Sequence, residues 1–170
     1  MSFRRPGRNE RPAGQKQESK GAIERQVEKA GVGGLKALVI HSSRGRLSPL
    51  VEGVRRGLES NGWTVDTVAA NPADSRPIAG GYDIVLVGSP ALGFWHGRAA
   101  DDIEPTLRRC RRLEGISAAA FVTPHAFATQ SALRHLMALL EREGAFVRDF
   151  ATLSTPHQAE EFGKRLARLR

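Results

Sequence analysis

Hydroxyl and guanidinium side chains surround a glycine in a short polar segment over residues 41–48. The segment holds three serines, two arginines and that glycine: Ser42, Ser43, Ser48, Arg44, Arg46 and Gly45. Hydroxyl, guanidinium and backbone N–H groups are the donors that bind phosphate, most effectively at the start of a helix. The segment therefore predicts a phosphate-binding loop. An ordinary polar connection is the alternative interpretation.

Three glycines and two adjacent aromatic residues mark a second segment, over residues 88–98. Glycine frees the backbone to approach a ligand closely. Exposed aromatic rings stack on flat ligands, which contributes ~0.5–1.5 kcal/mol beyond area burial. The segment therefore predicts a ligand-binding loop or an interface. The alternative is that Phe94 and Trp95 fold down as lids on the core.

The remaining reactive side chains give weaker signals. His125 follows an apolar run and is a candidate proton donor, with a turn or capping role as the alternative. Cys110, the single cysteine, stands among four arginines that would lower its thiol pKa if it were exposed. We expect it to be turned inward instead. Asp101 and Asp102 are expected to cap the following helix, and the five histidines show no metal-ligand spacing.

Apolar runs and amphipathic helical patterns alternate after residue 34. Strands are expected at residues 35–41, 63–68, 82–88, 117–123 and 146–153, and helices at 48–61, 103–113, 131–143 and 155–169. Strands that alternate with helices, and are apolar on both faces, predict an α/β fold with a three-layer, doubly wound, five-stranded parallel sheet. Ligands bind such sheets beyond the carboxyl ends of the strands. The polar segments above follow the first, third and fourth strands.

Two helix starts carry capping signals. Ser48 precedes Pro49, which predicts Ser48 as the N-cap and the proline as the first helical residue. Thr155 and Gln158 have the spacing of a capping box.

The 170 residues divide into a basic flexible N-terminal tail over residues 1–34, with a short helix expected at 22–30, and a folded domain over 35–170. Eight of the 26 Lys and Arg and four of the 18 Asp and Glu lie in the tail, so the tail and the domain each carry a formal charge of +4. No apolar run approaches the roughly 18 residues of a membrane span, and no signal-peptide core is present. We expect a cytoplasmic protein.

Residues 35–170 resemble the flavodoxin-like proteins. The resemblance rests on the order of elements, on Ser42-x-x-Gly45 after the first strand, and on the run from Tyr82 to Pro90 at the third. It implies the strand order 2-1-3-4-5 with FMN bound where the order reverses. It also implies that the loop over residues 42–48 wraps the FMN phosphate. The residues expected near the flavin ring are Ser89, Pro90, Ala91, Leu92, Gly93, Phe94, Trp95, Thr123 and His125.

Two positions depart from the family pattern. Leu47 stands where the family usually has threonine, although Ser48 offers a hydroxyl one residue later. Pro124 and His125 stand where FMN-binding members often have glycine, and proline has no N–H to donate.

The resemblance implies an FMN-binding redox protein that acts in electron transfer or in quinone or flavin reduction. Electron shuttles of the family are usually acidic, so the mildly basic domain disfavours a low-potential shuttle. Its partners would be a redox protein or a small-molecule acceptor, and a homodimer is a further prediction. The alternative is a flavin-free binding module on the same fold, tethered by its basic tail to nucleic acid or an acidic partner.

Overall fold

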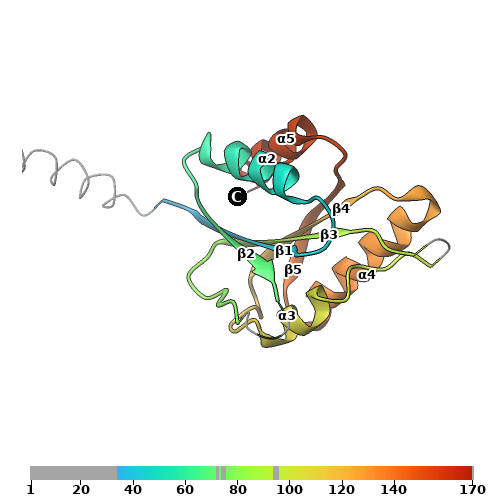
Figure 1. Ribbon diagram of the computed structural model, residues 1–170. Coiled ribbons are helices and arrows are strands. Elements are labelled where there is room, and N and C mark those ends of the chain that lie inside the picture. Colours follow the sequence, from blue (N-terminus) through green and yellow to red (C-terminus); the bar gives the residue numbers. More distant parts are fainter. Residues whose placement is uncertain (1–33, 72, 74–75, 94–95, 170) are drawn as a thin grey trace, which may run out of the picture. The chain divides into compact units, whose positions relative to one another are not determined.

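Five parallel strands form the centre of the domain in the computed structural model (Figure 1). They are β1 (Lys36–Ser42), β2 (Thr64–Ala70), β3 (Ile84–Pro90), β4 (Ser117–Thr123) and β5 (Phe146–Thr152). Their order is β2-β1-β3-β4-β5, and every neighbouring pair is parallel. This is the doubly wound sheet, with the strand order, that the sequence predicts. The structure describes residues 34–71, 73, 76–93 and 96–169, so the predicted tail and its short helix lie outside the described residues.

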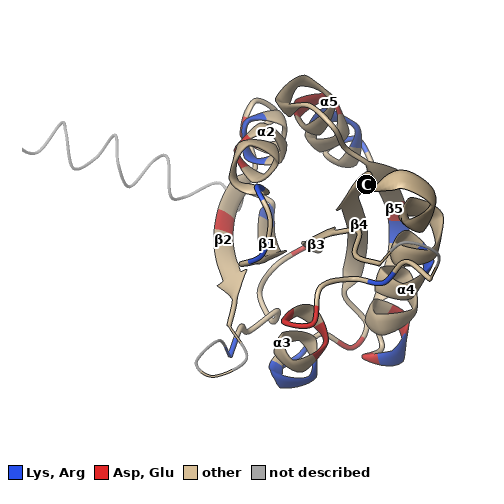
Figure 2. Cartoon of the chain, turned by 45° about the vertical axis from the view of Figure 1, so that its right-hand side comes forward, with Lys and Arg blue, Asp and Glu red and all other residues tan. Residues whose placement is uncertain are grey.

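Helices cover both faces of the sheet (Figure 2). One face carries α2 (Ser48–Glu59) and α5 (Pro156–Leu166), and the other carries α3 (Ile103–Arg109) and α4 (Thr129–Arg142). A 3-10 turn, η1 (Ala126–Ala128), precedes α4. Alternate residues of the central strands therefore enter two separate cores. Val39, Leu86 and Phe121 pack beneath α2 and α5, whereas Ile40 and Val87 pack beneath α3 and α4.

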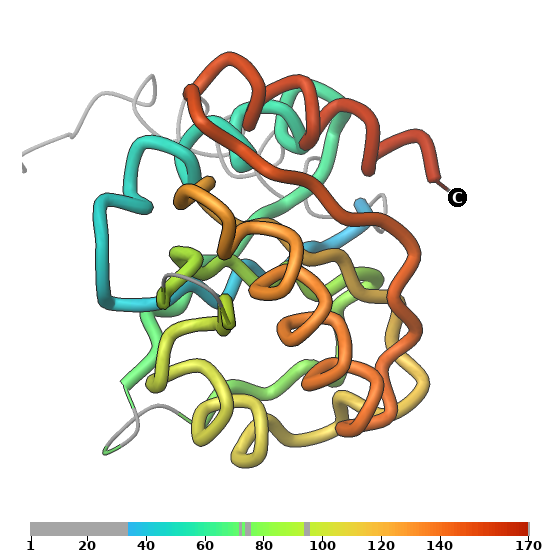
Figure 3. Tube along the Cα trace, turned by 90° about the vertical axis from the view of Figure 1, so that its right-hand side faces the viewer, coloured from blue at the N-terminus to red at the C-terminus, as the bar shows by residue number. Residues whose placement is uncertain are grey.

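Glycines bring α2 and α5 into close contact, and Figure 3 shows the two helices side by side. A Cβ on Gly57 would overlap the carbonyl oxygen of Glu160 and lie 2.9 Å from the Cα of Gly163. A Cβ on Gly53 would lie 2.5 Å from the carbonyl oxygen of Pro156. Backbone meets backbone at these positions, so no larger residue fits between the helices.

Several element boundaries differ from the sequence-based expectation. Leu47, not Ser48, occupies the N-cap position of α2, and no side chain caps that helix, so the predicted Ser48 cap is wrong. The third strand continues through Pro90, and α3 ends at Arg109 rather than near residue 113. The capping box of α5 is confirmed where the N–H of Gln158 donates to Thr155 Oγ1 at 3.2 Å. The Gln158 side chain accepts from the N–H of Ser154 at 2.8 Å. Within the described part of the chain, no helix is long and apolar enough to cross a membrane.

Candidate functional site

The carboxyl ends of β1, β3 and β4 bring the three polar segments together. A Cβ on Gly45 would lie 3.4 Å from the Cβ of Pro90, so the first loop packs on the end of β3. The N–H of Ala91 donates to the carbonyl oxygen of Thr123 at 3.3 Å. Gly97 lies directly against the backbone of Ala128, where a Cβ would overlap the carbonyl group. The sheet therefore places all three loops at one edge, as its topology requires.

A buried carboxylate holds the first loop. Asp102 is 5 % exposed, and its two oxygens accept from Ser42 Oγ at 2.8 and 2.9 Å. Its Oδ2 also accepts from the backbone N–H and the hydroxyl of Ser43, both at 2.8 Å. Ser42 Oγ in turn accepts from the N–H of Arg44 at 3.0 Å. Two of the three predicted phosphate-binding serines thus donate to a carboxyl group that belongs to the protein itself.

Asp102 occupies the N-cap position of α3, as expected, but the expected cap is wrong because its side chain makes no cap hydrogen bond there. Its carboxylate turns to Ser42 and Ser43 instead, because they offer two hydroxyls and one amide. Asp102 is a site residue that sequence reasoning missed. No local pattern could identify it, since 60 residues separate it from Ser42.

The other residues of the first loop divide by exposure. Leu47 is 2 % exposed and packs into the core beneath α2 and α5, so it offers nothing to a ligand. Gly45 adopts φ +74°, the left-handed conformation that favours glycine. Arg44, Arg46 and Ser48 are exposed to solvent.

The second loop leaves β3 as a closed turn. The backbones of Leu92 and Arg98 exchange two hydrogen bonds of 2.9 Å, and Gly93 turns the chain with φ +90°. Ser89 is fully buried, accepting from the N–H of Ala100 at 2.8 Å and donating to the carbonyl oxygen of Pro90 at 3.0 Å. Ser89 therefore braces the segment that follows the loop. Pro90 and Ala91 are buried and Leu92 is half-buried, whereas the predicted stacking residues Phe94 and Trp95 lie outside the described residues.

The third loop presents exposed side chains at the same edge. Thr123 is half-buried and His125 is exposed. The N–H of His125 donates to Thr129 Oγ1 at 2.9 Å, which fixes the turn before α4. Phe127 is 71 % exposed and is an aromatic group that sequence reasoning did not single out. An exposed phenylalanine can stack on a flat ligand.

The arginine run near Cys110 lies away from this edge. The helix α3 begins beside the site at Asp102 and runs back along the sheet for about 10 Å, given 1.5 Å per residue. Its basic last turn, with Arg108 and Arg109, is coloured blue in Figure 2. Arg111 then pairs with Ile78, ahead of β3. Closeness in sequence therefore does not place the arginine run at the site. The second loop carries Arg98 instead, whose guanidinium lies 3.6 Å from the carboxyl oxygen of Asp101.

The thiol of Cys110 is expected to be unreactive in the folded protein. Burial raises its pKa to about 11, and the charge of Glu143 adds to this, against a backbone hydrogen bond involving Ala79. Relative to an ordinary thiol pKa of 9.0, the thiolate fraction at neutral pH then falls about a hundredfold. We expect labelling with a thiol reagent to be slower by that factor in native than in denatured protein. Equal labelling rates in native and denatured protein would contradict this assignment.

The raised thiol pKa of Cys110 also makes the free energy of unfolding depend on pH. Its contribution is fully present at neutral pH and is lost as the pH rises toward 11, because the unfolded chain loses the thiol proton first.

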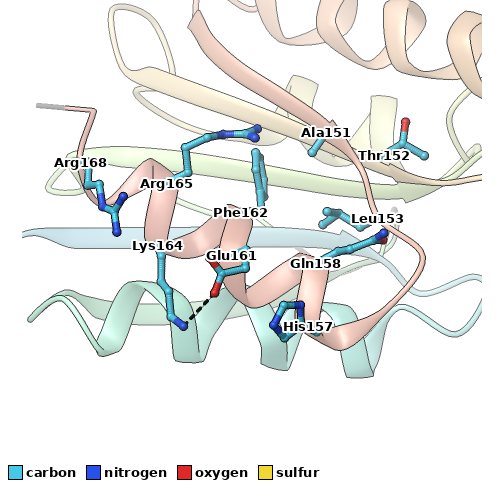
Figure 4. A pocket seen from close by; sticks show the side chains of 10 residues that line it. All are labelled: Ala151, Thr152, Leu153, His157, Gln158, Glu161, Phe162, Lys164, Arg165 and Arg168. Atoms are coloured by element: carbon cyan, nitrogen blue, oxygen red, sulfur yellow. Dashed lines mark hydrogen bonds and ion pairs between the residues drawn. The ribbon is translucent and has the colours of Figure 1, made fainter.

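Two hollows lie on the α2/α5 side of the sheet. One, of about 430 Å³, is lined by Arg46, Pro49, Thr123, Pro124, Ser154 and Pro156 at the carboxyl edge. It joins two predicted site residues, Arg46 and Thr123, to the start of α5. The other, of about 530 Å³, lies between α5 and the end of β5 (Figure 4), where Arg165 Cζ is 5.1 Å from the centre of the Phe162 ring. Among the described residues, no group of three or more His, Cys, Asp and Glu could hold a metal ion.

Comparisons with known proteins identify the fold. No family and no curated protein matches the sequence. Solved structures match well in shape. The flavodoxin of Megasphaera elsdenii in its two-electron reduced state superposes with a TM-score of 0.62 at 20% identity, over 76% of this chain and 98% of that one. Oxidised flavodoxin 1 of Bacillus cereus gives 0.60 at 17% identity, over 78% and 94%.

A larger protein contains the same unit. The flavodiiron core from Synechocystis sp. PCC6803 gives a TM-score of 0.60 at 19% identity, and the match spans 90% of this chain but only 40% of that one. Identities this low establish the fold alone. The chain has a flavodoxin-like fold, as the sequence motifs indicated.

The flavin ring and the FMN phosphate fit this edge differently. The ring end offers a glycine turn at Gly93, the exposed Phe127 and two loops in contact through Gly97. These features suit a planar, partly apolar group. At the phosphate end the hydroxyls of Ser42 and Ser43 are already bonded to Asp102. A phosphate group does not fit those donors as they are arranged.

Proposed function

We propose that the domain binds a flavin at the carboxyl edge of its sheet and acts in a redox reaction. The observation that carries this proposal is the meeting of the loops after β1, β3 and β4 on a sheet of the flavodoxin strand order. Two of the similar structures are flavodoxins whose reported states are oxidised and two-electron reduced. A bound flavin supplies reversible electron and hydride transfer, which the side chains of a protein do not.

The residues proposed to hold the ring come from two loops. Gly93 would contact it from one side, and Thr123, His125 and Phe127 from the other. Phe94 and Trp95, which the sequence predicts to stack on a ligand, lie outside the described residues. The exposed His125 would be available to exchange a proton with the ligand. The transfer of electrons to a protein partner or a small acceptor, and the choice between electron carrier and quinone or flavin reductase, belong to this proposal.

Flavin uptake by the purified full-length chain tests the proposal. We expect yellow colour, or a shift of flavin absorbance and fluorescence on titration with riboflavin or FMN. A ligand at about a hundred times its Kd stabilises a protein by about 2.7 kcal/mol, so the melting temperature should rise as well. The variant Phe127→Ala is expected to weaken binding, because the ring would lose ~0.5–1.5 kcal/mol of stacking. Absorbance and melting temperature that ignore excess flavin would contradict the proposal.

The flavin-free binding module is not favoured by the comparisons, and it is what a negative result of this titration would support. Its tether to nucleic acid or an acidic partner would lie in residues 1–34, almost all outside the described residues. The homodimer and the cytoplasmic location stay predictions.

A further inference from the structure

The first loop of the site is arranged around an anion, and that anion is a side chain of the domain. Asp102 reaches the loop from the start of α3 and is 5 % exposed. Both of its oxygens accept hydrogen bonds, from two hydroxyls and one amide. The backbone N–H of Ser43 can only donate, so it fixes Oδ2 as an acceptor, and the two hydroxyls lie within hydrogen-bond distance of the same carboxyl group.

The carboxyl group of Asp102 is held by neutral donors. Among the described residues Asp102 makes hydrogen bonds but no ion pair, and the nearby Arg98 is paired with Asp101 at 3.6 Å. A phosphate group brought to Ser42 and Ser43 would meet a negative charge at hydrogen-bond distance from the same donors. Like charges placed together at an interface disfavour binding.

A second feature of the loop points the same way. The side chain of Leu47 is buried in the core beneath α2 and α5, so the helix start contributes no hydroxyl at that position. The N–H of Arg44 is bonded to Ser42 Oγ at 3.0 Å. These donors of the loop are therefore not free for a phosphate: Asp102 accepts from the hydroxyl of Ser42 and from the hydroxyl and N–H of Ser43, and Ser42 Oγ accepts from the N–H of Arg44.

We propose that Asp102 is a specificity-determining residue that closes the phosphate subsite, so that the domain selects a flavin without a phosphate, of the riboflavin class, over FMN. This inference rests on the proposed function, because it concerns which flavin the site takes. The uncharged hydroxyl chain of riboflavin meets no repulsion from Asp102. The terminal phosphate of FMN does.

Binding of the two flavins to matched variants tests the inference. Riboflavin and FMN are titrated separately against the natural full-length chain, Asp102→Asn, Asp102→Ser and the control Asp101→Asn. The control removes the same charge one residue away, where the Asp101 side chain is 54% exposed and is paired with Arg98 of the second loop rather than with the serines of the first. Circular dichroism and thermal melting verify that each variant folds.

The natural chain is expected to bind riboflavin at least as tightly as FMN. Asp102→Asn should bind FMN about tenfold more tightly or better, the scale of one removed like-charge contact, with riboflavin affinity nearly unchanged. Asp102→Ser should behave alike, and Asp101→Asn should leave the ratio of the two affinities as it is.

The outcomes separate this inference from the proposed function. FMN binding about tenfold tighter than riboflavin by the natural chain would overturn the inference and leave the flavin function standing. An equal gain from Asp101→Asn would also overturn it, because the effect would then be general charge. FMN uptake by the Asp102 variants alone would support closure by Asp102 while removing the flavin role of the natural chain. If no protein takes up either flavin, the proposed function fails and the inference fails with it.

Discussion

Replacing Phe121 by alanine is expected to lower the free energy of unfolding by about 3–5 kcal/mol, the range for removing a buried phenylalanine. The ring is fully buried in β4. It meets Phe162 of α5 edge-on, with centroids 6.4 Å apart at 66°. It also covers Gly88 of β3, where a Cβ would overlap the ring. The truncation therefore leaves a cavity between the sheet and α5.

The contact between Phe121 and Gly88 allows a double-mutant test of this prediction. Gly88→Ala alone is expected to cost roughly 1–3 kcal/mol, because the methyl group overpacks against the ring. In the Phe121→Ala background the same methyl group enters free space, so the cost should vanish. Chemical denaturation of the four proteins measures this coupling, expected at about 1–3 kcal/mol.

The matched control is Phe150→Ala on the neighbouring strand β5, where the side chain is 51% exposed. Its expected cost is below about 1 kcal/mol, since partly exposed residues away from the core change stability little. An equal effect of Gly88→Ala in both backgrounds would show that the ring does not explain the glycine.

Replacing Gly57 by alanine is expected to destabilise the domain by about 2 kcal/mol. In an isolated helix the change would stabilise by about 1 kcal/mol, because alanine is the better helix former. Here the new methyl group would meet the carbonyl oxygen of Glu160 and the Cα of Gly163. Backbone atoms cannot rotate away as a side chain can, and overpacking costs about 1–3 kcal/mol or more. The steric term therefore decides the sign.

Arg56→Ala is the control for Gly57→Ala. Arg56 is the neighbouring residue of α2, and it is half-exposed and paired with Glu160 at 3.6 Å. We expect a change within about 0.5 kcal/mol. Thermal and urea unfolding of both variants gives the comparison, and a Gly57→Ala protein as stable as the natural one would mean that α2 and α5 separate at no cost.

Local patterns were sufficient for the elements and for the edge at which ligands bind. Apolar runs such as residues 84–87 are confirmed as strands. They could be predicted because a strand that is buried on both faces is apolar at every position. Parallel strands alternating with helices then require that the loops after β1, β3 and β4 share an edge. The cap of α5 at Thr155 is equally local, since its partner is three residues away.

Contacts between distant segments could not be predicted in this way. The pairing of Asp102 with Ser42 joins segments 60 residues apart, and it turns an expected helix cap into the occupant of the expected phosphate loop. The arginines at residues 108–112 are near the second loop in sequence, but α3 carries them to the other end of the sheet. Phe127 gave no local signal because an exposed ring and a buried one look alike in sequence.

Local sequence patterns were enough to predict a doubly wound parallel sheet and a polar edge with serine, glycine and arginine side chains, and the family resemblance supplied the strand order. Hydrophobic periodicity and turn chemistry are properties of short segments, so they can be read along the chain. Which donors at that edge are already bonded within the protein depends on contacts between distant segments, and these appear only in the folded domain. A hydrogen-bond donor pairs with whichever acceptor the fold places near it. Here the buried carboxyl group of Asp102, at the start of α3, accepts from Ser42 and Ser43.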